Sequence, residues 1–175
     1  MIYRQPADST RGPNCGPTSV AVLTANQLSD VMNLIQRQGS YPMNWKGSTR
    51  NRGGRFSGEG GECFRALQEL GANPVVETGL EARHGKRQLS NVVAALPHDR
   101  AYLICTGQHA QAVVGDRVFD QSTAPEGDHV SAFWGRRKKV NVIISVDRMD
   151  TASKKDDAAT VSDFVVRVVQ LEAVA

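Results

Sequence analysis

The sequence predicts an α+β domain in which helices come first and an antiparallel β-sheet follows. Apolar residues recur at helical spacing up to about residue 96, and alternating, strand-like segments follow between residues 101 and 146. Helices followed by antiparallel strands are typical of α+β folds. With 175 residues the chain has the length of one ordinary domain, so we expect residues 1–175 to fold as a single unit.

The composition is typical of a soluble globular protein. Hydrophobic residues make up 40% and charged residues 22%, and no segment approaches the roughly 20 apolar residues of a membrane span. The first six residues lack the basic region and apolar core of a secretory signal. A net charge of +3 neither requires nor excludes a nucleic-acid partner. We therefore expect a soluble, cytoplasmic protein without a membrane segment.

The first predicted element is an amphipathic helix over residues 17–38. Its apolar residues recur at steps of three and four: Val20, Leu23, Leu28, Val31, Leu34 and Ile35. Pro17 suits the first turn, where no intrahelical N–H bond is lost. Residues 39–61 are rich in Gly, Ser, Asn and Arg and contain few apolar residues, which predicts a long, exposed, basic and glycine-rich loop.

Two shorter helices and one strand complete the first half. Helical spacing predicts a helix over 61–70 that ends at Gly71. Residues 75–77 follow an Asn-Pro pair and are typical of a short strand. A third helix is predicted over 89–96, and Pro97 ends it.

The second half is predicted to contain successive antiparallel strands. Alternating apolar residues indicate strands over 101–105, 109–114, 117–120 and 140–146. Gly115-Asp116 predicts a tight hairpin between the second and third of these strands. A polar joint at 154–157 precedes a last apolar segment, 161–171, which suits either a strand or a helix.

Cys15 lies where a loop becomes a helix, in the stretch "RGPNCGPTSVAV". A helix N-terminus lowers the pKa of a thiol because the helix dipole favours the thiolate. The unpaired backbone N–H groups there can also bind the oxyanion of a tetrahedral intermediate. Cys15 is therefore the candidate nucleophile.

The other two cysteines have the pattern of core residues. Cys63 lies on an apolar helix face and Cys105 lies within the apolar stretch "AYLIC". Three cysteines at wide, irregular spacing argue against both a disulfide framework and a zinc site of paired CxxC motifs. We expect free thiols, no metal and no cofactor.

A nucleophilic cysteine needs a base, and His109 is the candidate. His109 begins a predicted strand, and Asp120 ends the next strand after the hairpin, so antiparallel pairing can bring the two ends side by side. A carboxylate beside the imidazole would hold it in one tautomer. His129 is the rival base, because it also opens an alternating stretch and could pair with Asn141.

The two remaining histidines are expected in solvated loops. His84 lies in the polar run "EARHGKR", and His98 follows the helix-ending Pro97. Neither context positions an imidazole toward Cys15.

The motifs "NCGPTSVAVLT" and "GQHAQAVVGDRVFDQST" resemble those of the papain-like cysteine peptidase superfamily, in particular its small C39-like peptidases. The hairpin also resembles the transglutaminase-like branch, although the spacing from Cys15 to His109 suits the peptidase branch better. The resemblance implies a papain-like fold in which the N-terminal helix carries the nucleophile and packs on the C-terminal sheet. It implies Cys15 as nucleophile, His109 as general base and Asp120 as its orienting residue.

The sequence departs from the family pattern upstream of the cysteine. In such enzymes a glutamine about six residues before the cysteine completes the oxyanion hole. Here that position is Ser9, and Gln5 lies further upstream. Gln5, Ser9 and Asn14 are thus the candidates for oxyanion or substrate binding.

Three functions are compatible with these residues. The first is a cysteine peptidase or amidase that cleaves an amide or isopeptide bond of a protein or peptide substrate. The second is a transglutaminase-like acyl transferase, in which an amine replaces water. The third is a catalytically inactive, papain-like binding module that uses the basic loop at 46–56. Aromatic residues are scarce near the basic runs, which argues against nucleic-acid binding.

Overall fold

The computed structural model describes residues 3–9, 14–37, 61–84, 86–107 and 109–147. The loop predicted over 39–61, apart from Gly61, and the apolar segment 161–171 lie outside the described residues.

In the described residues six antiparallel strands form one sheet, in the order β1-β6-β2-β3-β4-β5. The strands are β1 (Val75–Val76), β2 (Ala101–Thr106), β3 (His109–Val114), β4 (Arg117–Phe119), β5 (Asp128–His129) and β6 (Val142–Val146). The long strands β2, β3 and β6 are adjacent, and β2 pairs with both of the others. The predicted hairpin is confirmed, because Gly115 joins β3 to β4 with a φ of 59° that suits glycine. The α+β class is also confirmed.

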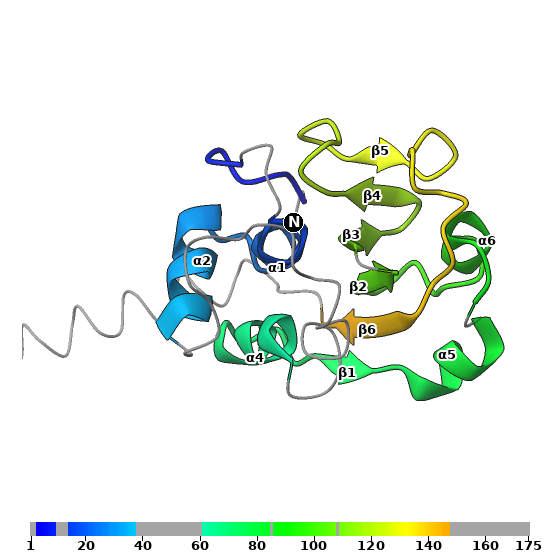
Figure 1. The fold of residues 1–175 in the computed structure, drawn as a ribbon, viewed down its shortest axis with the longest axis horizontal. Coiled ribbons are helices and arrows are strands. Elements are labelled where there is room, and N and C mark those ends of the chain that lie inside the picture. The colour runs from blue at the N-terminus through cyan, green and yellow to red at the C-terminus, as the bar shows by residue number, and fades with distance from the viewer. Residues whose placement is uncertain (1–2, 10–13, 38–60, 85, 108, 148–175) are drawn as a thin grey trace, which may run out of the picture.

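Helices cover both faces of the sheet (Figure 1). One face carries α1 (Cys15–Thr24), α2 (Leu28–Arg37) and α4 (Glu62–Glu69), and the other carries α5 (Thr78–His84) and α6 (Leu89–Val93). Each face has its own apolar core because strand residues alternate in direction. Leu103 and Ile144 face α1, whereas Ile104 and Ile143 face α6. In the described parts of the chain, every helix is too short or too polar to cross a lipid bilayer.

The single helix predicted over 17–38 is wrong, because the chain breaks between α1 and α2. Ala25 adopts the left-handed conformation with a φ of 53°, and its N–H donates to Ala21 O. The second helix is capped from outside its own sequence. The Asp8 carboxylate accepts the N–H groups of Leu28 and Ser29, each at 2.8 Å. Apolar spacing continues across the break, so periodicity alone could not locate it.

Amphipathic character belongs to α2 and not to α1. In α2, Leu28, Val31, Leu34 and Ile35 are buried, while Ser29 and Asp30 are exposed. In α1 every residue from 16 to 24 is buried, which is the pattern of a helix enclosed on all sides. Two of its three hydroxyls donate within the helix, Ser19 Oγ to Cys15 O and Thr24 Oγ1 to Val20 O, both at 2.8 Å.

The other predicted elements occur with shifted ends. The helices expected over 61–70 and 89–96 are α4 and α6, and Gly71 follows α4 with a φ of 75°. Residues 78–84 form α5, so the prediction that His84 lies in a loop is wrong. Despite its polar sequence, this segment is a helix that packs through Leu80 on the apolar core between the sheet and α6.

Cys63 and Cys105 are buried free thiols, as predicted. Cys63 lies where α4 meets α1, and a Cβ placed on Gly16 would lie 2.8 Å from Cys63 Sγ. Burial raises the pKa of the Cys63 thiol well above its ordinary value, as do the nearby charges of Cys105, Cys15 and Glu62. Cys63 is therefore a packing residue that requires glycine at position 16.

We expect Gly16→Ala to lower the free energy of unfolding by about 1–3 kcal/mol, because the new methyl group overlaps the Cys63 sulfur. Denaturant titration measures this change. Gly79→Ala in α5 is the control, because a Cβ there meets nothing within 4 Å, and it should be neutral or stabilise by up to about 1 kcal/mol. The double variant Gly16→Ala/Cys63→Ala should recover part of the loss. Equal stability of Gly16→Ala and Gly79→Ala would contradict the proposed contact.

Candidate active site

The structure brings Cys15, His109 and Asp120 together from three separate elements. Cys15 is the first residue of α1, His109 is the first residue of β3, and Asp120 directly follows β4. The register of the β3–β4 hairpin pairs Ala112 with Phe119, so Asp120 returns alongside the first half of β3. Because α1 packs on β3, the cysteine at its N-terminus reaches the same place.

A short, buried contact joins the histidine and the aspartate. His109 Nε2 lies 2.7 Å from Asp120 Oδ2, and the side chains are 14% and 0% exposed. The other carboxylate oxygen, Oδ1, accepts the backbone N–H and the hydroxyl of Ser122, both at 2.6 Å. Burial raises the pKa of Asp120, but the bonds from His109 and Ser122 outweigh burial and hold it below the ordinary 3.8. The Asp120 carboxylate is therefore charged, and both of its oxygens have hydrogen-bond partners.

The Cys15 thiol is a hydrogen-bond partner of His109. Burial alone would raise its pKa, but three groups stabilise the thiolate more strongly: the His109 ring, the backbone N–H of Ala110 and the backbone N–H of Gly16. Together they hold the pKa of Cys15 below its ordinary 9.0. Because Nε2 of the ring faces Asp120, Nδ1 is the atom left for the sulfur.

The histidine shifts in the opposite direction from the cysteine. Burial lowers the pKa of His109, but the hydrogen bonds and charges of Asp120 and Cys15 raise it to about 9. A lowered thiol pKa and a raised imidazole pKa both favour the thiolate–imidazolium pair. The interaction of the two groups therefore favours a thiolate beside an imidazolium over a neutral thiol beside a neutral imidazole.

Trp134 and Ser122 complete the surroundings of the pair, and the sequence reasoning assigned neither of them to the site. The indole of Trp134 meets the His109 ring edge to face, with centroids 5.3 Å apart. Its Nε1–H donates to Ser122 Oγ at 2.9 Å, and Ser122 in turn donates to Asp120. The spacing Asp-x-Ser is typical of a turn in which the aspartate accepts bonds two residues ahead, and this signal could have found Ser122.

Gln5 holds the loop that carries Asp120. Its side-chain Nε2 donates to the backbone oxygens of Asp120 and Thr123 and to Thr123 Oγ1, the last two at 2.8 Å. Its backbone N–H donates to Pro125 O at 2.8 Å. The amide predicted to bind an oxyanion is thus engaged by this loop, and within the described residues no hydrogen bond joins it to Cys15.

Ser9 and Asn14 have different positions relative to Cys15. Ser9 is half-buried beyond a turn, where its N–H donates to Pro6 O at 3.0 Å. Asn14 is buried next to Cys15, and its backbone oxygen accepts the Thr18 N–H at 2.9 Å. Of the three residues predicted upstream, only Asn14 is adjacent to Cys15.

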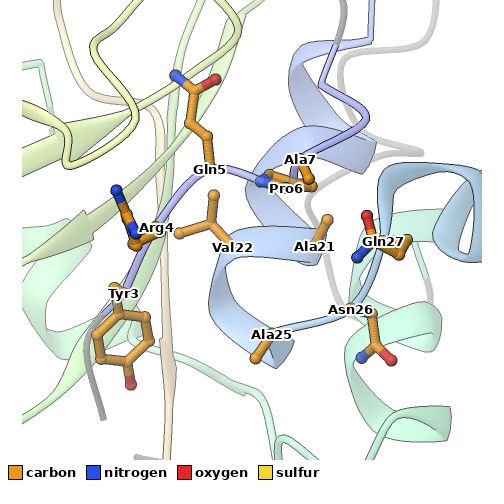
Figure 2. A pocket seen from close by; sticks show the side chains of 10 residues that line it. All are labelled: Tyr3, Arg4, Gln5, Pro6, Ala7, Ala21, Val22, Ala25, Asn26 and Gln27. Carbon is orange, nitrogen blue, oxygen red and sulfur yellow. The ribbon is translucent and has the colours of Figure 1, made fainter.

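A pocket lies between the N-terminal residues 3–7 and the end of α1 (Figure 2). Ala21, Val22, Ala25, Asn26 and Gln27 form its other wall. Figure 2 shows the amide of Gln5 pointing away from Ala25 and Asn26. Ala25 lies at the opposite end of α1 from Cys15, about 15 Å away along a ten-residue helix. Gln5 connects this pocket to the Cys-His-Asp site, because its side chain donates to the backbone oxygen of Asp120.

The rival histidine is occupied elsewhere. His129 lies on β5 with its side chain 54% exposed, and its ring contacts Asp116 at 3.3 Å and Ser131 Oγ at 2.7 Å. No hydrogen bond joins it to Asn141 among the described residues. His98 is exposed, as predicted. The parts of the chain that the structure describes contain no cluster of three or more His, Cys, Asp or Glu side chains suited to a metal ion.

Comparisons with known proteins yield no match. Neither the models of known protein families, nor the curated proteins, nor the solved structures contain a significant relative of this chain.

We expect Gln5→Leu to reduce stability by about 1–3 kcal/mol, because the backbone oxygens of Asp120 and Thr123 lose a donor in a partly buried place. Gln5→Glu should be worse, since it brings a carboxylate against these oxygens. Thermal unfolding measures both changes. The exposed neighbour Arg4 supplies the control Arg4→Gln, which should change stability by less than about 0.5 kcal/mol. Wild-type stability of Gln5→Leu would show that Gln5 does not anchor the loop.

We expect Cys15 to react with iodoacetamide below pH 9.0, because His109 and two backbone N–H groups lower its thiol pKa. The rate should rise as the thiolate forms and change again near pH 9, where the imidazolium loses its proton. In His109→Ala burial acts with less opposition, so the titration should move to a higher pH. Mass spectrometry of the Cys15 peptide measures the rate, and buried Cys63 is the internal control. Identical profiles in the two proteins would contradict the coupling.

Proposed function

We propose that this protein is a papain-like cysteine hydrolase that cleaves an amide or isopeptide bond of a protein or peptide. The observation that carries this proposal is the contact of Cys15, His109 and Asp120, with pKa shifts of opposite sign on the thiol and the imidazole. Reactive cysteines have this environment, whereas structural cysteines are buried and inert. The order of a nucleophile helix before a His-bearing hairpin also supports a papain-like arrangement.

The proposed mechanism begins with attack of the Cys15 thiolate on the carbonyl carbon. The C–S bond forms as the carbonyl π pair moves to oxygen, and backbone N–H groups at the start of α1 receive the oxyanion. The C–N bond then breaks, and the Nδ1 proton of His109 goes to the leaving amine. Water next attacks the thioester while His109 takes its proton, and the thiolate leaves with the acid product released.

The Asp120 carboxylate orients the base through both steps. Its bond to Nε2 leaves Nδ1 directed at the sulfur, and its charge stabilises the imidazolium. Asp120 is itself oriented by Ser122. A ring held in this way needs no rearrangement before it transfers the proton.

A non-catalytic binding module is the second candidate, and the position of Gln5 favours it. The Gln5 amide, the side chain expected to complete the oxyanion hole, donates to the loop after β4. Backbone groups alone would then bind the oxyanion. Transglutaminase-like acyl transfer uses the same three residues, and formation of a conjugate with an added amine distinguishes it from hydrolysis.

We expect Cys15→Ala to abolish cleavage of a peptide library without unfolding the protein, because no nucleophile remains. His109→Ala should reduce the rate about 10³-fold or more, and Asp120→Ala should reduce it less, because Asp120 acts through the imidazole. Mass spectrometry locates the cleaved bonds, and a mass shift on Cys15 detects the thioester. Cys105→Ala is the matched control and should retain activity. Cleavage by the Cys15→Ala variant at the wild-type rate would exclude the mechanism.

A further inference from the structure

Trp134 presents an apolar ring to solvent directly beside the proposed base. The residue is 53% exposed, and Val75 is the only other large hydrophobic residue with comparable exposure in the described ranges. Two contacts hold the indole in place: its Nε1–H donates to Ser122 Oγ, and its ring packs against the His109 ring. A fixed, exposed aromatic surface of this kind is typical of a binding site.

The loop that carries Trp134 is held rigidly. Phe133 is fully buried in the second core, and a Cβ on Gly135 would lie 2.6 Å from its ring. The backbone oxygens of Arg136 and Lys138 accept the N–H groups of Ser90 and Leu89 at 3.0 and 2.9 Å. The indole is therefore already oriented before any ligand arrives, which reduces the entropy lost on binding.

Four consecutive cations follow the tryptophan in the sequence: Arg136, Arg137, Lys138 and Lys139. The Lys138 ammonium lies over the Trp134 ring, 4.0 Å from its centroid. Among the described residues none of the four forms an ion pair with a carboxylate. Such a cluster of positive charge favours an acidic ligand over a neutral or basic one.

The place of Trp134 in the proposed reaction indicates which part of a substrate it meets. His109 gives its proton to the leaving amine, so this amine must lie within hydrogen-bond reach of the imidazole. Trp134 packs on the same imidazole. The chain that continues from the leaving amine therefore passes the indole and the Lys138 ammonium.

We propose that Trp134 and Lys138 form a subsite for the leaving half of an acidic peptide. This inference rests on the proposed hydrolase function and names its substrate class. An Asp or Glu side chain would pair with Lys138 while its aliphatic part lies on the indole. An acidic peptide fits better than a nucleic acid, because successive bases need several stacking rings and the described site offers one.

Fluorescence of Trp134 can report occupancy of this subsite directly. The chain has two tryptophans, so the full-length variant Cys15→Ala/Trp45→Phe leaves Trp134 as the only one and prevents turnover. The probes are three peptides with free amino termini that mimic the leaving product: Ala-Glu-Glu-Ala-amide and its Gln-Gln and Lys-Lys analogues. We expect the Glu peptide to bind about fivefold tighter than the Gln peptide, the upper range for one exposed ion pair, and the Lys peptide to bind least.

Variants of Lys138, with Arg83 as the control position, test whether Lys138 is the source of the preference. Lys138→Gln should remove the fivefold difference, Lys138→Arg should retain it, and added salt should reduce it in the parent protein. Arg83→Gln, which removes an equal charge from α5, should leave it unchanged. The proposed subsite would be overturned if the Glu and Gln peptides bound equally, or if the preference survived in Lys138→Gln. It would also be overturned if no peptide changed the fluorescence, or if oligothymidylate bound more tightly than the Glu peptide.

The proposed function and the subsite fail separately. Peptide cleavage by the protein with Cys15 intact tests the hydrolase, whereas the fluorescence titration needs no chemistry. Acidic preference without cleavage would leave a binding site on a non-catalytic protein. Cleavage without acidic preference would leave the hydrolase and remove the subsite.

Discussion

The enclosure of α1 by the sheet on one side and by α2 and α4 on the other is the constraint on which the candidate site depends. Every residue from 16 to 24 is buried, so the helix can neither slide nor rotate without opening the first core. Its first residue, Cys15, is thereby held at a constant distance from β3. This packing requires a glycine at position 16, because Cys63 of α4 lies so close that a side chain there has no room.

The loop after β4 connects this scaffold to the chemistry. Asp120 lies at its start and accepts bonds from His109 and Ser122, while Gln5 donates to its backbone oxygen. The Ser122 hydroxyl in turn accepts a hydrogen bond from the Trp134 indole N–H. Every polar atom of the Asp120 side chain thus has a partner, which is what allows a charged carboxylate to remain stable with no exposure to water.

Local patterns in the sequence indicated much of this arrangement. Cys15 stands at a turn-to-helix junction, and the short hairpin at Gly115 has so few residues that the register of His109 and Asp120 follows from it. The broad order of helices first and antiparallel strands later could also be predicted, from the change of periodicity near residue 100, but α5 and the two-residue strand β5 were not predicted.

Other features depend on contacts between distant residues, which no local pattern encodes. Trp134 contacts His109 from a loop 25 residues further along the chain, next to the buried Phe133. The break at Ala25 is supported by Asp8, which caps α2 from a segment twenty residues earlier. Gln5 was assigned by its distance along the chain, and the hydrogen bonds that engage it come from a loop 115 residues away.

The contact between Gln5 and Asp120 also affects when the site can form during synthesis. Residue 5 leaves the ribosome before its acceptors on the loop after β4, which are made 115 or more residues later. Closing so long a loop carries an entropic penalty that local contacts avoid, so this contact belongs to the slow, non-local part of folding. A nascent chain therefore contains Cys15 long before it contains His109 and Asp120. The thiol would become reactive only after the sheet is complete, which would limit premature chemistry on partly made chains.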